Sequence, residues 1–428
     1  MGPSLYDSAR ARLQATLARR IHTVADARRI ARRRVPRAVF DYIDGGAGRE
    51  LTMGANERAF ADVVLRPRMG QTAGVPGPCL ATTVLGIPVD LPILLSPVGF
   101  TRMMDPLGDV AGAGGAGRAG TIFTLSSMSG HALRDVADAA REASGPLGGR
   151  AGLQDPDGLE VTKGRAPWFQ LYFLGGRAGA EQLVERARDA GFGALVVTMD
   201  TQLPGNRERD LRHGLSPPIE LSRRNVLKLA PQVALRPSWL ADLVADGFNL
   251  ELVHAAELGP PGTPQGVPEA LLNWILRPPV WDDFGWLKEV WQGKIVVKGV
   301  LTGDDARRAL DAGADAVVVS NHGGRQLDGV PATLPALVEV VRACGDDLEV
   351  YVDGGIRRGS DVVRALALGA RAAMIGRAWA YGLAAAGAPG VDRILSVLRT
   401  DLDRTLRLLG CASVGELSGE WATIPEEW

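Results

Sequence analysis

Cysteine, aromatic residues and net charge are all scarce in this chain of 428 residues. Its three cysteines, Cys79, Cys344 and Cys411, are far apart, and neither they nor the five histidines show the spacing of a metal site or a disulfide framework. We therefore expect no bound metal and a reducing compartment, the cytoplasm. The 48 basic residues nearly balance the 49 acidic ones, and this formal net charge of -1 argues against a nucleic-acid-binding protein.

Long apolar runs are absent too. No stretch reaches the roughly 20 residues that a membrane-spanning helix needs, and the first residues lack the apolar core of a secretory signal. Hydrophobic residues nevertheless make up 46% of the chain, which is enough for a large buried core. Because α/β barrels run from ~200 to over 400 residues as one unit, we expect a single domain over residues 1–428.

Short apolar runs alternate with amphipathic, alanine-rich stretches from residue 91 onward. The runs at 194–198 and 316–320 are apolar almost throughout, which is typical of parallel strands that are covered on both faces. Eight such runs follow one another along the chain: 91–96, 121–125, 168–172, 194–200, 294–299, 314–320, 349–353 and 372–376. Eight strand–helix units in sequence predict an α/β fold, a (β/α)8 TIM barrel over residues 91–380.

Three regions lie outside this repeat. Residues 1–65 are predicted to be an N-terminal helical segment, and residues 385–428 a C-terminal one. The interval of about ninety residues after the fourth strand is far longer than a usual loop, so we expect an insertion or lid over residues 205–285. The first segment is rich in arginine, which we interpret as the solvated face of amphipathic helices rather than as a targeting signal or an anionic-surface contact.

Polar residues follow the carboxyl end of each predicted strand, and in a barrel these ends meet at the rim where active sites are built. From its position alone, Lys298 is either a surface lysine or a Schiff-base nucleophile. Asp353-Gly-Gly-Ile-Arg357, followed one unit later by Gly376-Arg377, predicts a phosphate site. In barrels, backbone N–H groups and guanidinium groups bind phosphate after the seventh and eighth strands.

His322 stands between the sixth strand and two glycines, Gly323 and Gly324, which let a ligand approach the backbone closely. Arg325 follows three residues later. An imidazole beside a guanidinium suits removal of a proton from a substrate anchored by its carboxylate. Asp200, after the fourth strand, is then expected to stabilise the imidazolium. A purely structural histidine is the alternative.

A glycine-rich stretch at residues 112–117 formally matches the GxGxxG pattern of dinucleotide-binding proteins. It does not directly follow a strand, and the sequence continues as an alanine-rich helix. We therefore interpret it as a small-residue helix that packs closely on the barrel.

The pattern as a whole resembles the FMN-dependent (S)-2-hydroxy acid oxidases and dehydrogenases, a family that includes glycolate oxidase, lactate dehydrogenase and mandelate dehydrogenase. The most specific motif is Ser-Asn-His-Gly-Gly-Arg-Gln-Leu-Asp at 320–328. Phe-Asp-Tyr-Ile-Asp-Gly-Gly-Ala at 40–47 and the Asp-Gly-Gly-Ile-Arg motif at 353–357 support it. The resemblance covers roughly residues 22–415, is weak over 211–285, and is greatest to bacterial quinone-linked L-lactate dehydrogenases.

The resemblance implies FMN as the cofactor and assigns residues to it. Lys298 would face the edge of the flavin ring where its charge stabilises the anionic reduced form, which outranks the Schiff-base role. The residues implied to bind FMN are Pro97, Val98, Gly99, Ser126, Gln170, Thr198, Lys298, Ser320, Asp353, Gly355, Arg357, Gly376 and Arg377.

The resemblance also implies a substrate site. Tyr42, Arg207 and Arg325 would bind the substrate carboxylate, and Tyr172 would contact its hydroxyl. His322 would be the catalytic base, with Asp200 as its partner. The sequence departs from the family at two positions: Gly99 replaces an alanine found in many members, and Met128 replaces a tryptophan of the plant enzymes. We therefore expect an altered pocket for the substrate side chain, with Met128 in its wall.

The resemblance thus predicts oxidation of a small (S)-2-hydroxy acid, such as L-lactate or mandelate, to the 2-oxo acid, with electrons passed to quinone or oxygen. Family members usually form tetramers, and the same is expected here. Two alternatives remain: an FMN oxidase acting on a larger or peptide-derived substrate, and a phosphate-binding barrel isomerase or aldolase that uses Lys298 covalently.

Segment 221–240 combines four cations with apolar residues and contains no acid. Such a stretch suits a peripheral contact with an anionic bilayer, on the inner face of the cell membrane, where electrons would reach quinone. The alternative is a lid that buries the same apolar residues against the barrel.

Overall fold

Eight parallel strands form a closed barrel in the computed structural model, which describes residues 5–71, 77–144, 165–214, 223–256, 258 and 278–428. The order of pairing is β4-β11-β10-β9-β8-β7-β6-β5. The ring closes where Leu95 bridges Phe123 and the N–H of Leu95 donates to Ile122 O at 3.0 Å. The strands are β4 (Ile93–Leu95), β5 (Thr124–Ser126), β6 (Trp168–Leu171), β7 (Ala194–Thr198), β8 (Lys294–Val300), β9 (Ala316–Val319), β10 (Glu349–Val352) and β11 (Ala372–Ile375). The predicted TIM barrel is confirmed.

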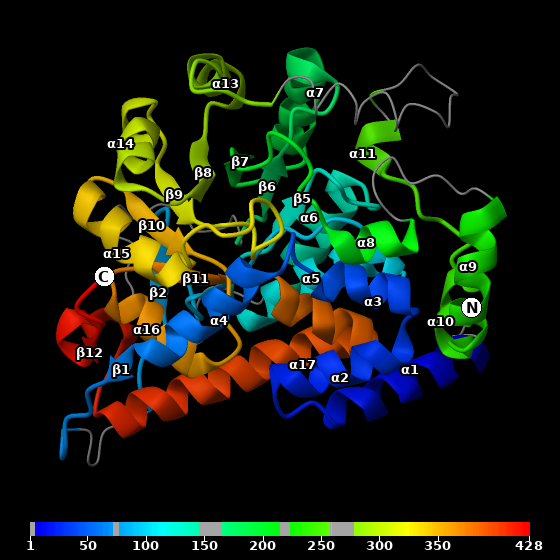
Figure 1. The fold of residues 1–428 in the computed structure, drawn as a ribbon, viewed down its shortest axis with the longest axis horizontal. Coiled ribbons are helices and arrows are strands. Elements are labelled where there is room, and N and C mark those ends of the chain that lie inside the picture. Colours follow the sequence, from blue (N-terminus) through cyan, green and yellow to red (C-terminus); the bar gives the residue numbers. More distant parts are fainter. Residues whose placement is uncertain (1–4, 72–76, 145–164, 215–222, 257, 259–277) are drawn as a thin grey trace.

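Helices cover the outside of this barrel (Figure 1). They follow the strands in the expected alternation: α5 (Gly108–Ala119), α6 (Leu133–Ala143), α7 (Gly176–Asp189), α13 (Asp283–Trp291), α14 (Gly303–Asp311), α15 (Thr333–Cys344), α16 (Gly359–Ala367) and α17 (Arg377–Leu409). Helix α5 carries the glycine-rich stretch. A Cβ at Gly112 would lie 2.5 Å from the Phe123 ring, and one at Gly117 would lie 2.6 Å from Ala140 O. The glycines therefore serve close packing, as the sequence indicated.

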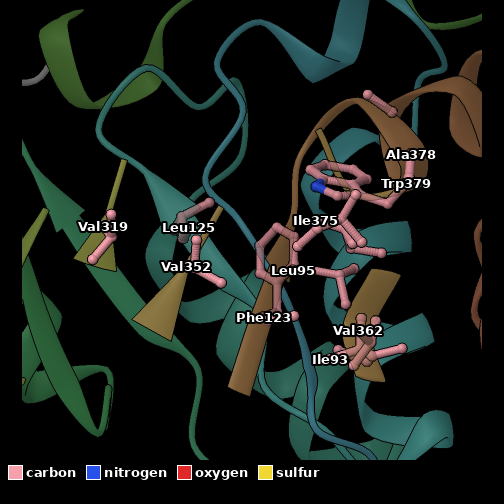
Figure 2. Packing of buried hydrophobic residues seen from close by; sticks show 14 of the residues in the cluster. Ile93, Leu95, Phe123, Leu125, Val319, Val352, Val362, Ile375, Ala378 and Trp379 are labelled. Carbon is pink, nitrogen blue, oxygen red and sulfur yellow. The ribbon is translucent and has the colours of Figure 1, made fainter. Parts of the chain in front are cut away.

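Two apolar layers hold the strands in place, because successive strand residues point to opposite faces. Leu94, Val196, Val318 and Tyr351 belong to one buried cluster, together with Val84 of the hairpin formed by β2 (Thr82–Val84) and β3 (Ile87–Val89). The alternate residues belong to the larger cluster between strands and helices. Figure 2 shows part of that cluster, with Ile93, Leu95, Phe123, Val362 and Trp379.

The N-terminal helices are α1 (Leu5–Arg19), α2 (Val24–Arg34), α3 (Arg37–Asp44) and α4 (Leu51–Asp62). Helix α2 begins with a capping box, in which the Thr23 side chain accepts from the N–H of Asp26. Helices α1 and α2 lie along α17 (Figure 1). Short strand β1 (Val64–Leu65) pairs with β12 (Ala422–Thr423) near the other end of the chain.

The long interval between β7 and β8 carries α8 (Glu208–His213), α9 (Arg223–Ala234), α10 (Pro237–Ala245) and α11 (Val253–Ala256) before α13. Helix α10 is tied to the rest of the protein by buried polar contacts. The Arg34 guanidinium donates to Asp242 at 2.5 Å, and the indole N–H of Trp239 donates to Met103 O at 2.8 Å. Residues 215–222 and 259–277 of this interval lie outside the described residues.

Candidate active site

A cleft opens at the carboxyl ends of the barrel strands, with an empty volume of about 1250 Å³ including its mouth. Two predicted site residues, Asp200 and Ser320, do not line it themselves but bond to side chains that do. The other predicted residues all line it: Tyr42, Pro97, Val98, Gly99, Ser126, Met128, Gln170, Tyr172, Thr198, Arg207, Lys298, His322, Arg325, Asp353, Gly355, Arg357, Gly376 and Arg377.

His322 is held in a strained turn at the end of β9. Its φ of +59° is left-handed, and Gly323 and Gly324 continue the turn with φ values of +65° and +72°. Its N–H donates to Ser320 Oγ at 3.0 Å. Its Nδ1 lies 3.1 Å from Asp200 Oδ1, so Nδ1–H donates to the carboxylate and Nε2 is left for a ligand in the cleft.

The surroundings of His322 keep the imidazole neutral. Burial lowers the pKa of His322 from its ordinary value, and the Lys298 charge adds to this effect, while the Asp200 carboxylate opposes it. Burial by itself would raise the pKa of Asp200, but the imidazole of His322 and the Lys298 cation hold it below its ordinary value. The pair is therefore a neutral base backed by a carboxylate, which suits proton abstraction.

Two guanidinium groups face the same part of the cleft as His322. Arg325 Nη1 donates to the backbone oxygens of Tyr42 and Gly45 at 2.7 and 2.9 Å. The Cζ atoms of Arg325 and Arg207 lie 5.0 and 5.7 Å from the centroid of the Tyr42 ring. Burial and the nearby Arg207 charge lower the pKa of Arg325 to about 10. This excess of positive charge favours an anionic ligand.

Two tyrosines complete this end of the cleft. Tyr42 donates from its hydroxyl to Gly99 O at 3.2 Å. Burial, with the Asp200 charge adding to it, raises the pKa of Tyr172 well above its ordinary value, so the phenol stays protonated and can donate. Both hydroxyls thus lie at the end of the cleft where the anion would bind.

Lys298 is an ion-paired ammonium rather than a free amine. Its Nζ donates to Ser320 Oγ at 2.8 Å and lies 3.2 Å from Asp353 Oδ2, with the side chain only 4% exposed. A Schiff-base lysine attacks a carbonyl through a free nitrogen lone pair, whereas the Nζ of Lys298 is bonded to a hydroxyl and a carboxylate. The contacts therefore argue against the covalent role that the sequence left open.

Unsatisfied polar groups line the same cleft as Lys298. The Nε2 of Gln170 and the Oγ1 of Thr198 are buried, line the cleft and have no partner among the described residues, while Ser126 Oγ donates to Gln170 Oε1 at 3.0 Å. Buried donors without partners are rare in native proteins and indicate a ligand with matching acceptors. A flavin ring offers carbonyl and ring-nitrogen acceptors, so these residues fit FMN.

The expected phosphate end shows one surprise. A Cβ at Gly376 would meet nothing closer than 3.8 Å, so the backbone there is open to a ligand. Arg357 lines the cleft while its guanidinium also pairs with Glu57 at 2.9 Å. Arg377, however, donates to the backbone oxygens of Ile43, Gly323 and Gly45. Besides facing the cleft, it therefore pins the turn after α3 to the loop that carries His322.

Sequence reasoning missed several lining residues, among them Thr201 and Gln326. Thr201, directly after Asp200, is buried and lines the cleft. Gln326, directly after Arg325, donates to the backbone oxygens of Asp200 and Leu203 and so holds the Asp200 loop in place. Their positions beside two predicted site residues were the available signal.

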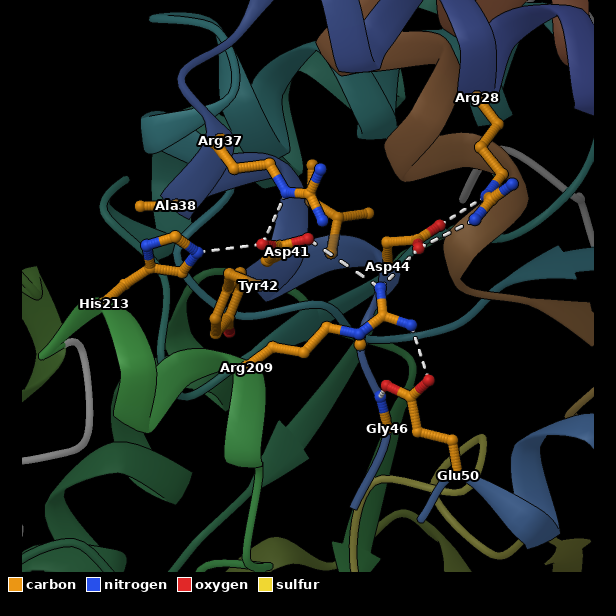
Figure 3. A network of polar contacts seen from close by, with 12 residues as sticks. Arg28, Arg37, Ala38, Asp41, Tyr42, Asp44, Gly46, Glu50, Arg209 and His213 are labelled. Atoms are coloured by element: carbon orange, nitrogen blue, oxygen red, sulfur yellow. Dashed lines mark hydrogen bonds and ion pairs between the residues drawn. The ribbon is translucent and has the colours of Figure 1, made fainter. Parts of the chain in front are cut away.

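A network of charges joins α3 to α8 (Figure 3). Arg209 pairs with Asp44 at 2.8 Å and with Glu50 at 2.5 Å, and His213 Nε2 lies 2.8 Å from Asp41. Burial opposes ionisation of Asp44, but bonds from Arg28, Tyr381 and Arg209 hold its pKa well below the ordinary value. The network fixes α3, which carries Tyr42, against α8, whose first turn follows Arg207.

Comparisons with known proteins agree with this geometry. The chain is 39% identical to the L-lactate dehydrogenase of Caulobacter vibrioides, over 93% of this chain and 96% of that one. It is also 39% identical to the pre-mycofactocin synthase of Mycobacterium tuberculosis, over 94% of each chain. The crystal structure of the monotopic membrane protein (S)-mandelate dehydrogenase superposes with a TM-score of 0.81 at 34% identity, covering 95% of this chain and all of that one.

The sequence also matches the family of FMN-dependent dehydrogenases over residues 31–423, which includes every barrel strand and every predicted site residue. The chain therefore belongs to the FMN-dependent dehydrogenase family and is an FMN-dependent oxidoreductase.

Proposed function

We propose that this protein oxidises a small (S)-2-hydroxy acid to the corresponding 2-oxo acid. The observation that carries the proposal is the neutral imidazole of His322, bonded to the Asp200 carboxylate, beside the guanidinium groups of Arg207 and Arg325. A 2-hydroxy acid offers a carboxylate for the cations and, one carbon away, a hydroxyl group for the base. When bound, FMN supplies the acceptor for the two electrons that the substrate loses.

The roles of the side chains follow from their positions. Arg207 and Arg325 bind the carboxylate through paired N–H groups, and Tyr42 lies against both. His322 Nε2 accepts the proton that leaves the substrate, while Asp200 stabilises the imidazolium. Tyr172 stays protonated and donates to the substrate oxygen. Lys298 places a buried positive charge against the proposed flavin site.

The names of the relatives support this substrate class and suggest one competitor. L-lactate dehydrogenase and (S)-mandelate dehydrogenase are both named for 2-hydroxy acids that carry a carboxylate. Pre-mycofactocin synthase is not named for a 2-hydroxy acid, so the alternative of a larger substrate stays open. Arg207 pairs with Asp210 at 3.1 Å, whereas Arg325 bonds to the backbone oxygens of Tyr42 and Gly45. The charge of Arg325 therefore favours a substrate that carries a carboxylate.

Anaerobic bleaching of the bound flavin tests the proposal. L-lactate, (S)-mandelate and their uncharged amides are mixed with the protein, and the flavin absorbance is followed. We expect an acid to bleach the flavin and its amide to fail. Bleaching by neither acid, or equal bleaching by acid and amide, would contradict the proposed substrate class.

We further propose that the insertion contacts an anionic membrane surface and that quinone is the electron acceptor. Leu235, Val244, Phe248 and Leu250 expose large apolar side chains on or next to α9 and α10. No helix within the described ranges is long and apolar enough to cross a membrane, so the proposed contact is peripheral. The similar mandelate dehydrogenase is described as monotopic, which supports such a contact.

This surface differs from the one that the sequence suggested. Trp239, an apolar residue of segment 221–240, is buried and donates to Met103 O, and Val233 packs against the core. The positions of these two residues agree with the alternative interpretation, in which the segment packs its apolar residues against the barrel. Residues 221 and 222, and the side chains of 223–228, lie outside the described residues.

The tetramer remains a prediction from the family resemblance. Closed symmetric assemblies are common among soluble enzymes, and exposed Leu203 and Leu327 lie near the mouth of the cleft. Light scattering at micromolar concentration measures the oligomeric state, and a monomer at that concentration would contradict the predicted tetramer.

A further inference from the structure

One wall of the cleft contains a strained residue outside the proposed chemistry. Phe100, directly after Gly99, has a φ of +58°, a left-handed conformation that a bulky side chain rarely adopts. Its ring packs edge-on against Tyr42, with centroids 5.7 Å apart. Such a conformation persists only where the surrounding structure enforces it, and it is often found at functional sites.

The strained residue is pressed against the loop that carries Met128. The N–H of Phe100 donates to Met128 O at 3.0 Å. The two segments approach so closely that a Cβ at Gly99 would lie 2.8 Å from Met128 Cβ. Residues 99–101 follow β4, and residues 128–131 follow β5. We call these two segments together the side-chain wall, because Met128 is expected to lie beside the side chain of the substrate.

Asp109 joins the two halves of this wall from behind. It lies in the first turn of α5, is fully buried and does not line the cleft. Its Oδ2 accepts from Thr101 Oγ1 at 2.8 Å and from Ser129 Oγ at 2.6 Å. One carboxylate oxygen therefore bonds to a residue next to Phe100 and to a residue next to Met128.

Two neighbours show how closely this carboxylate is enclosed. His131 Nε2 lies 3.0 Å from Pro106 O, and its Nδ1 lies 3.5 Å from Asp109 Oδ2. Gly108, with a φ of +30°, brings α5 against the wall. A Cβ at Gly108 would lie 2.6 Å from the His131 ring and 2.7 Å from Thr101 Oγ1.

We propose that Asp109 is a positioning residue that holds the strained Gly99–Phe100 backbone against Met128 and thereby sets the room for the substrate side chain. Without the shared acceptor, the hydroxyls of Thr101 and Ser129 lose their common partner, and the strain at Phe100 favours separation of the two halves. The effect on the substrate side chain rests on the proposed function, whereas the contact of Asp109 with Thr101 and Ser129 does not.

The test compares three variants with a matched control. Asp109→Leu removes the acceptor at similar size. Asp109→Asn keeps an oxygen that can accept from both hydroxyls. Ser129→Ala removes only the hydrogen bond from Ser129 to Asp109. It is the milder variant if Asp109→Leu folds poorly. Asp138→Asn, on the exposed face of α6, is the control.

Hydrogen exchange measures the contact without any substrate. We expect the amides of residues 97–104 and 126–133 to exchange about tenfold faster in Asp109→Leu and Ser129→Ala, because local opening becomes easier. Exchange in Asp109→Asn should be close to that of the parent and of the control. Parent-like protection in both Asp109→Leu and Ser129→Ala would overturn the proposal, whether or not any 2-hydroxy acid proves to be a substrate.

The specificity of flavin reduction measures the consequence. The ratio of kcat/KM for (S)-mandelate to that for L-lactate, per bound flavin, should change by about tenfold in Asp109→Leu and Ser129→Ala and recover in Asp109→Asn. A purely structural role would lower the flavin-loaded fraction and leave this ratio unchanged, which would overturn the proposal. If neither acid reduces the parent flavin, the proposed function fails and the exchange result alone decides the role of Asp109.

Discussion

His322 Nδ1 lies 3.1 Å from a carboxylate oxygen of Asp200, although the two residues are 122 positions apart in the chain. The contact forms because β7 and β9 both pair with β8, which brings the loops after them together. It orients the imidazole and leaves Nε2 for the substrate. The chemistry that we propose depends on this contact more than on any other.

Replacing Asp200 with asparagine should slow flavin reduction by ~10²–10⁴-fold, because the imidazolium loses its stabilising charge. The parent rate should fall as the pH drops through the pKa of His322, which lies below the ordinary value of 6.5. Since Asp200 raises that pKa, the acid limb of Asp200→Asn should move to lower pH. Stopped-flow reduction at a series of pH values measures both effects. If Asp200→Asn reduced the flavin at the parent rate and its acid limb stayed at the parent pH, Asp200 would be excluded as the partner of His322.

Arg325→Lys should raise KM by roughly 10- to 100-fold, because an ammonium cannot donate a paired fork to a carboxylate. The pKa of Arg325 is lowered to about 10, so the KM of the parent should also rise as the pH passes that value. Arg308→Lys, at an exposed position on α14, is the control. Steady-state kinetics with whichever of L-lactate and (S)-mandelate reduces the flavin faster measure this change. Equal KM values for the parent and Arg325→Lys would argue against carboxylate binding by Arg325.

Gly99→Ala should lower kcat/KM and stability, because the new Cβ lies 2.8 Å from Met128 Cβ and overpacking costs ~1–3 kcal/mol. Met128→Ala keeps its Cβ and should not rescue the variant, whereas Met128→Gly should. Gly285→Ala, where the Cβ meets nothing within 4 Å, is the control. Rescue by Met128→Ala as well would show that the clash involves atoms beyond the two Cβ positions.

Arg209→Met should lower the free energy of unfolding at pH 7 by about 1–3 kcal/mol, because Asp44 and Glu50 lose a charged partner. The lowered pKa of Asp44 means that its contribution is present above the unfolded pKa, near 4, and is lost as the pH falls further. The difference between parent and variant should therefore shrink below about pH 4. Urea unfolding at several pH values measures it, with Arg212→Met, an exposed neighbour on α8, as the control. A constant difference down to pH 2 would contradict the role of Asp44.

The paired change Leu235→Ser and Phe248→Ser should reduce sedimentation with anionic liposomes, because two exposed apolar side chains are lost from the proposed membrane surface. Met69→Ser removes an even more exposed apolar side chain from the loop before β2 and should have no effect. Turnover with a soluble quinone and turnover in air are compared in parallel. Absence of liposome binding by the parent, together with faster turnover in air, would identify a soluble oxidase.

Much of the site could be predicted from sequence because its residues lie in short motifs at strand ends. The motif around His322 and the Asp-Gly-Gly-Ile-Arg motif at 353–357 each supply several lining residues within a few positions. Asp109 was missed because a single aspartate in an alanine-rich helix has no local signal. Its importance depends on Thr101 and Ser129, which reach it from two different loops.

The amino-acid sequence by itself determined the eight strands, the glycine-rich helix and the residues at the carboxyl ends of the strands, because apolar periodicity and glycine placement are local properties. Only the tertiary structure decided that Trp239 is buried rather than exposed, that the guanidinium of Arg377 holds three backbone oxygens, and that Lys298 is ion-paired with Asp353. Burial and charge pairing depend on which distant segments meet, and the pattern of a single segment does not specify its partners.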